Sequence, residues 1–109
     1  MELSIRSQGL DLSDSLRSYA ERRLRLSLAG FGTHVNGIEV RLADINGPRG
    51  GVDKTCAVTV MLRKCGVVFA RAAGESAYAT VNRAAARIRT AVVRTLSRRH
   101  GNRRRLRRQ

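Results

Sequence analysis

The sequence is short of acidic residues, aromatic residues and long apolar runs. Its 109 residues hold eight Asp and Glu against 22 Lys and Arg, a formal net charge of +14. A charge of this size exceeds what solubility requires, and it repels itself unless a polyanion neutralises it. No apolar run is long enough for a signal peptide or approaches the ~20 residues of a membrane span. We therefore expect a cytoplasmic protein with a polyanionic partner and no membrane contact.

Aromatic and soft metal-binding residues are also scarce. With two Tyr, two Phe and no Trp, nothing resembles the aromatic strand motifs that stack single-stranded bases, so we expect recognition through helices. The only cysteines, Cys56 and Cys65, are nine positions apart, and His34 and His100 are scattered, which disfavours a structural metal site. Cys56 lies on the apolar phase of an expected strand, which predicts a buried thiol. No metal or cofactor is expected.

The apolar content of 42% and the single proline are typical of a chain that folds, and the length fits one domain. Residues 1–100 are expected to form this domain, with residues 101–109 as a basic, disordered tail.

Two apolar patterns predict helices. After a capping Ser13, an apolar residue recurs every four positions, at Leu16, Ala20, Leu24 and Leu28, which predicts a helix over 14–29. A second apolar stripe predicts a helix from Ala77 to about 99. The stripe consists of Tyr78, Val81, Ala85, Ile88, Val92 and Leu96.

Alternating apolar residues predict four strands. One precedes the first helix and ends near residue 8, a second begins at Val35, and a third follows the turn formers of 46–51. The fourth begins at Val67, after a short turn at 64–66. The order predicts an α+β fold, β-α-β-β-β-α, with two helices packed on one face of a four-stranded sheet.

The last helix carries the strongest functional signal. No acidic residue occurs from Ser76 to the end, yet this segment holds eleven of the twenty arginines. At ~100° per residue, four of them fall within a sector of about 60° opposite the apolar stripe. We call Arg83, Arg87, Arg94 and Arg98 the arginine stripe. A solvated helix face normally mixes acidic and basic residues, so the stripe favours polyanion binding.

The first helix adds a weaker basic contribution. It carries Arg17, Arg22, Arg23 and Arg25, diluted by Asp14 and Glu21. The tail is expected to act as a nonspecific electrostatic anchor that adds affinity without choosing a site. The predicted RNA-binding residues are therefore Arg17, Arg22, Arg23, Arg25, Arg83, Arg87, Arg94 and Arg98.

The choice of cation favours nucleic acid. Arginine binds phosphate through two parallel hydrogen bonds and stacks on bases, and the chain has twenty arginines against two lysines. A general structured-RNA module, such as a double-stranded RNA domain, is the main alternative. That domain type would need a lysine-rich start to its last helix, which Ser76 and Ala77 do not provide. An enzyme is disfavoured, because Asp44, Asp53 and Glu75 are isolated and no catalytic pairing or phosphate loop occurs; no small-molecule substrate is expected.

Three segments resemble one known family, the ribosome hibernation promoting factors, also called ribosome-associated inhibitor or sigma-54 modulation proteins. They are residues 1–5, Met-Glu-Leu-Ser-Ile; residues 12–20, Leu-Ser-Asp-Ser-Leu-Arg-Ser-Tyr-Ala; and, most specific, residues 78–82, Tyr-Ala-Thr-Val-Asn. The resemblance covers about 1–99.

The resemblance implies binding to small-subunit ribosomal RNA in the channel used by messenger and transfer RNA, with occlusion in place of catalysis. Matching basic positions are Arg17, Arg23 and Arg25 on the first helix and Arg87 and Arg94 on the second, whereas Arg83 and Arg98 rest on the helical period alone. The dimerisation domain that other members carry is not expected here.

Overall fold

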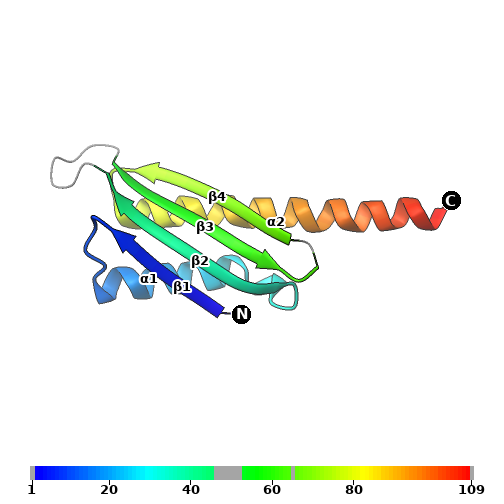
Figure 1. The fold of residues 1–109 in the computed structure, drawn as a ribbon, viewed down its shortest axis with the longest axis horizontal. Helices are drawn as coiled ribbons and strands as arrows, with labels where there is room; N and C mark the ends of the chain where they lie inside the picture. The colour runs from blue at the N-terminus through cyan, green and yellow to red at the C-terminus, as the bar shows by residue number, and fades with distance from the viewer. Residues whose placement is uncertain (1, 46–52, 65, 109) are drawn as a thin grey trace.

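The computed structural model describes residues 2–45, 53–64 and 66–108, and it confirms the predicted order of elements (Figure 1). The elements are β1 (Glu2–Gln8), α1 (Asp14–Ser27), the 3-10 turn η1 (Ala29–Phe31), β2 (Val35–Asp44), β3 (Lys54–Leu62), β4 (Gly66–Gly74) and α2 (Ala77–Arg108). The predicted turn at 46–51 lies outside the described residues. In the predicted turn at 64–66, Lys64 and Gly66 have positive φ angles, and Cys65 is outside the described residues.

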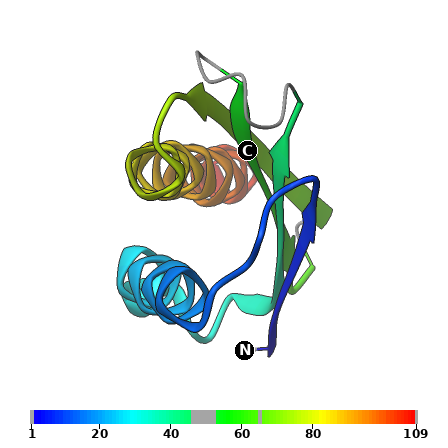
Figure 2. The same ribbon diagram turned by 90° about the vertical axis from the view of Figure 1, so that its left-hand side faces the viewer.

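The four strands form one sheet in the order β1-β2-β3-β4. β1 runs parallel to β2 because α1 crosses between them, whereas β2, β3 and β4 are successive antiparallel neighbours. Both helices lie side by side on one face of the sheet (Figure 2). We call the opposite face, which neither helix covers, the open face.

Strand alternation decides which side chains enter the core. The side chains that the alternation predicts to share one face are buried under the helices. They are Ile38, Val40 and Leu42 of β2 and Cys56, Val58 and Val60 of β3. Leu24 of α1 and Ile88 of α2 are completely buried against them. Cys56 is a buried free thiol, and burial raises its pKa to about 12, so the thiol stays protonated at physiological pH.

Both helices begin at the residues that the sequence predicts, but neither helix ends at its predicted residue. Ser13 Oγ accepts a hydrogen bond from the Leu16 N–H at 3.2 Å, and Ser76 Oγ accepts one from the Ala79 N–H at 3.3 Å. α1 ends at Ser27, two residues before the predicted end at 29, because the chain tightens there into η1.

α2 continues to Arg108, past the predicted end near residue 99. Glycine inside a helix costs only about 1 kcal/mol relative to alanine, and the arginines around Gly101 are good helix formers. α2 therefore extends well beyond the end of the sheet (Figure 1). The division between a domain at 1–100 and a tail at 101–109 stays a prediction.

Candidate nucleic-acid interface

Polar contacts join α1 and α2 along their length. Arg23 Nε donates a hydrogen bond to Asn82 Oδ1 at 2.6 Å, and the buried Ser27 Oγ donates one to the carbonyl oxygen of Ala85 at 2.7 Å. Arg89 Nη1 in turn donates to the Ser27 carbonyl oxygen at 2.9 Å. Later residues of α1 contact later residues of α2, so the two helices run in the same direction, side by side in one layer.

Two arginines of the stripe are tied to the sheet. Arg83 Nη1 donates to the carbonyl oxygen of Ala73 at 2.6 Å, and Arg87 Nη1 donates to that of Arg71 at 2.7 Å. β4 is an edge strand, so these carbonyls have no neighbouring strand to pair with in the described sheet. A guanidinium carries five N–H donors, and the bond to β4 uses only one. Arg83 and Arg87 thus cover the sheet edge and keep donors for a phosphate.

The arginine stripe forms one exposed surface, as the helical period predicts. Arg83, Arg87 and Arg94 line a shallow hollow of about 390 Å³ together with Ala86, Thr90 and Ala91. Arg98 is exposed one turn beyond Arg94. The lining is therefore basic, and the residues between the guanidinium groups have small uncharged side chains.

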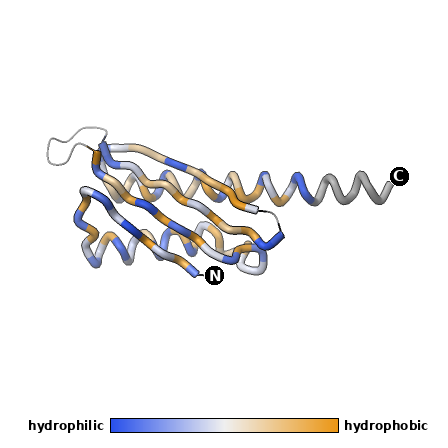
Figure 3. The backbone as a smooth tube through the Cα atoms, in the orientation of Figure 1, coloured by the Kyte–Doolittle hydropathy of each residue, from blue (hydrophilic) through white to orange (hydrophobic). Residues whose placement is uncertain are grey.

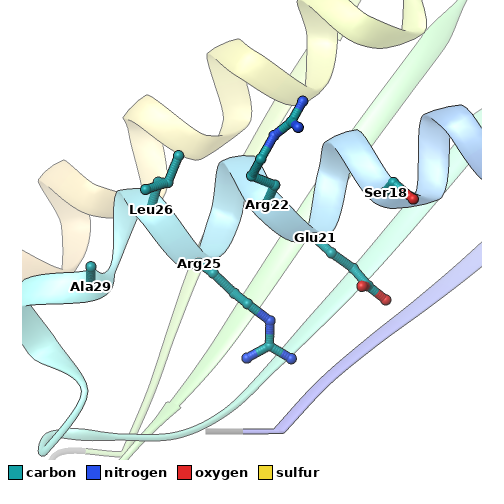
Figure 4. Close-up of a pocket in the computed structure, with 6 residues that line it drawn as sticks. All are labelled: Ser18, Glu21, Arg22, Arg25, Leu26 and Ala29. Carbon is teal, nitrogen blue, oxygen red and sulfur yellow. The ribbon is translucent and has the colours of Figure 1, made fainter.

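The basic residues of α1 are more dispersed. Arg22 and Arg25 line a separate hollow of about 550 Å³ with Ser18, Glu21, Leu26 and Ala29, and the two arginines project in different directions (Figure 4). Arg17 is exposed one turn before Glu21, whereas Arg23 is half-buried beside Asn82. Five of the eight predicted residues therefore line the two hollows, Arg22 and Arg25 in one and Arg83, Arg87 and Arg94 in the other. Arg17 and Arg98 are exposed outside both hollows, and Arg23 lies between the helices.

Arg89 is a structural residue that the sequence pattern did not single out. It donates to Ser27 as described, and its guanidinium carbon lies 5.3 Å from the centre of the Phe31 ring, a cation–π contact. The helical period could have indicated this separate role, because it places Arg89 at least ~120° away from the arginine stripe. Its role is to bind the end of α1 to α2.

Tyr78 belongs to the apolar stripe of the second helix, where core packing is expected, but the structure places it elsewhere. Its side chain is 43% exposed, and its ring lies 5.1 Å from that of Tyr19 with the planes tilted by 58°. The prediction was wrong because Tyr78, in the first turn of α2, faces α1 and not the sheet. The tyrosine pair holds the N-terminal ends of the two helices together.

Asp44 and Asp53 are not isolated, contrary to the expectation. Lys54 Nζ lies 3.0 Å from Asp53 Oδ1 and 3.6 Å from Asp44 Oδ2, and the hydrogen bond to Asp53 raises the pKa of Lys54. Asp53 is only 1% exposed. The two carboxylates are brought together when β2 and β3 pair, which sequence spacing does not show. The cluster fastens the ends of β2 and β3, with the lysine between the two carboxylates.

Within the ranges that the structure describes, no group of three or more His, Cys, Asp or Glu side chains could hold a metal ion. None of the described helices is long and apolar enough to cross a membrane.

Comparisons with known proteins agree with this fold. A ribosomal subunit interface protein from Coxiella burnetii superposes with a TM-score of 0.77 at 20% identity, covering 89% of this chain and 99% of that chain. The N-terminal domain of Protein Y from Thermus thermophilus superposes with a TM-score of 0.66 at 24% identity, covering 85% and 93%. At these identities the likeness shows a shared fold. No curated protein matches the chain significantly.

The family comparison reaches further than the fold. The model of the family described as sigma 54 modulation protein / S30EA ribosomal protein matches residues 3–100. This range includes α1, the part of α2 that carries the arginine stripe, and all four strands apart from Glu2. Because the match spans nearly the whole chain, the protein belongs to the sigma 54 modulation protein / S30EA ribosomal protein family.

Proposed function

We propose that this protein binds ribosomal RNA of the small subunit, in the channel used by messenger and transfer RNA, and inhibits translation by occupying that channel. The observation that carries the proposal is the arginine stripe, an exposed basic surface on a helix whose sequence holds no acidic residue. The chain belongs to a family whose description names a ribosomal protein, which supports a ribosomal partner. The similar fold of a ribosomal subunit interface protein from Coxiella burnetii supports the same class of partner.

The proposed action is occlusion, which requires shape and charge and no chemical step. Hydrogen bonds to backbone carbonyls hold three arginine side chains in place: Arg83 and Arg87 donate to β4, and Arg89 donates to α1. Side chains that are already ordered lose less conformational entropy when they bind phosphate. A prearranged basic layer of this kind suits the fixed phosphates of folded ribosomal RNA. The site of action would then be the cytoplasm, where small subunits work.

A general structured-RNA module is the alternative, and the same charge distribution would serve it. The two functions differ in selectivity. A channel-binding protein competes with messenger and transfer RNA for one site on each subunit, whereas a general module binds any folded RNA.

Co-sedimentation with purified small subunits at near-physiological salt distinguishes them. We expect saturable binding of about one protein per empty subunit, resistant to excess bulk RNA and DNA, and loss of binding when messenger and transfer RNA fill the channel. If the protein neutralises ~6 to 10 phosphates, the log–log plot of the binding constant against salt should fall with a slope of about −0.7 to −0.9 per phosphate. Binding that the competitors remove, or that ignores channel occupancy, would contradict the proposal and favour the general module.

A further inference from the structure

The open face of the sheet carries a second basic surface, on the opposite side of the sheet from the helices. Strand register places Arg6 of β1 beside Arg41 of β2, Arg41 beside Ala57 of β3, and Ala57 beside Arg71 of β4. Arg6, Arg41 and Arg71, which we call the open-face row, are all exposed. With neighbouring strands about 4.8 Å apart, the row spans roughly 14 Å across the whole sheet.

The open-face row is unfavourable for folding alone. Like charges on neighbouring strands destabilise a sheet, and Arg6 and Arg41 are direct neighbours. Within the described part of the chain, no ion pair neutralises any of the three arginines. Glu39 is the one acidic residue among those that line the hollow at this face. The row therefore has a net positive charge that an anionic partner would relieve.

An exposed aromatic ring lies next to the open-face row. Phe69 of β4 is 59% exposed and lies two residues from Arg71 on the same strand and face. It lines a broad hollow of about 790 Å³ with all three arginines, over a floor that includes Ala57 and Thr59. Hydrophilic stretches interrupt β1, β2 and β4 in Figure 3, which views the molecule from this side. The scarcity of aromatic residues predicted no base stacking on the sheet, but the face places this one ring beside a basic row.

We propose that the open face binds single-stranded RNA, with one base stacked on Phe69 and the phosphates on either side contacting Arg6, Arg41 and Arg71. Four-stranded sheets bind single strands in this way, with an aromatic side chain under the base and cations along the backbone. A duplex would suit the face less well, because its bases are paired and stacked and would leave Phe69 without a partner. The inference does not depend on the proposed function, since it concerns the opposite side of the molecule.

Removing the ring tests the stacking contact. The probe is a ten-nucleotide single-stranded RNA with one 2-aminopurine, whose fluorescence falls when the base stacks, added to the full chain at near-physiological salt. Phe69→Leu, which keeps an apolar side chain, should weaken binding by roughly tenfold, the size of one lost base–aromatic stack, and should abolish the quenching. Phe69→Tyr should bind within about twofold of wild type, because any aromatic ring can stack on a base.

Val67→Ala is the matched control. Val67 is 65% exposed on the same strand and face, but it has no ring. It should leave both affinity and quenching unchanged. The charge test is the double variant Arg41→Gln, Arg71→Gln, which should reduce the log–log salt slope by about 1.4, or 0.7 for each lost phosphate contact. Arg63→Gln, in the exposed turn after β3, is its control and should change the slope less.

Three results would overturn the inference. The first is binding and quenching by Phe69→Leu at wild-type levels. The second is loss of quenching in the double variant Arg94→Gln, Arg98→Gln but not in Phe69→Leu, which would assign the single strand to α2. The third is an effect of Phe69→Leu on the oligomeric state alone in sedimentation velocity, which would make the face a protein interface. None of these results bears on small-subunit binding, which the co-sedimentation experiment measures separately.

Discussion

The two helices of this protein lie on the same face of the sheet but differ in how they use arginine. α1 carries its basic residues among Asp14 and Glu21, and its arginines point in several directions. α2 has no acidic residue, places the arginine stripe on one side, and holds Arg83 and Arg87 against β4. Both helices bury apolar side chains in the core, but only α2 presents arginines on one outer side with no acidic residue in the helix.

In the core, the two helices should be equivalent. Leu24 of α1 and Ile88 of α2 are both completely buried. Replacing either with alanine should lower the free energy of unfolding by about 3 kcal/mol, because each substitution removes apolar contacts and leaves a cavity. Urea denaturation measures the loss. The control is Leu26→Ala, at an exposed position of α1, which should cost less than about 0.5 kcal/mol. A loss at only one of the two buried positions would show that one helix is dispensable for the core.

At the outer surface, the helices should differ. The double variant Arg94→Glu, Arg98→Glu should weaken small-subunit binding by roughly a hundredfold, because two phosphate contacts become repulsive on an otherwise acid-free helix. The matched variant Arg17→Glu, Arg22→Glu on α1 should cost only about tenfold, since Glu21 already weakens the field there. Co-sedimentation at fixed salt gives both affinities, with circular dichroism to confirm folding. Equal losses would erase the distinction between α1 and α2.

Within α2, the tied and untied arginines should separate stability from binding. Arg87→Met removes the hydrogen bond to the Arg71 carbonyl oxygen and should lower the free energy of unfolding by about 1 kcal/mol, or the melting temperature by roughly 5 °C. Arg94 makes no such bond within the described residues, so Arg94→Met should leave thermal unfolding unchanged. Both should weaken RNA binding similarly. If Arg87→Met melts as wild type does, the contact with β4 contributes nothing measurable.

The elements and their buried sides were predictable because local geometry sets them. The alternation of Ile38, Val40 and Leu42, the four-residue recurrence of Leu16, Ala20 and Leu24, and the capping Ser13 each depend on neighbours in the chain. The ends of α1 and α2 were less predictable. They depend on a short 3-10 turn and on a small energetic penalty at Gly101, which periodicity does not measure.

The candidate site was predictable in part for the same reason. The helical period placed Arg83, Arg87 and Arg94 on one side of α2, and the structure confirms it. The period could not reveal that Arg87 donates to β4 or that Arg89 donates to Ser27, because those partners are 16 and 62 positions away in the chain. It also led to the wrong position for Tyr78, which turns toward α1 and contacts Tyr19.

The sequence by itself determined the charge of +14, the order of the elements and the residues that share one face of each element. The physical reason is that a helix or strand repeats every few residues, whatever it packs against. Only the tertiary structure decided which elements are neighbours. Arg6, Arg41 and Arg71 form a row, with Phe69 beside it, because strand register aligns residues that lie 35 and 30 positions apart, and no local pattern encodes that alignment.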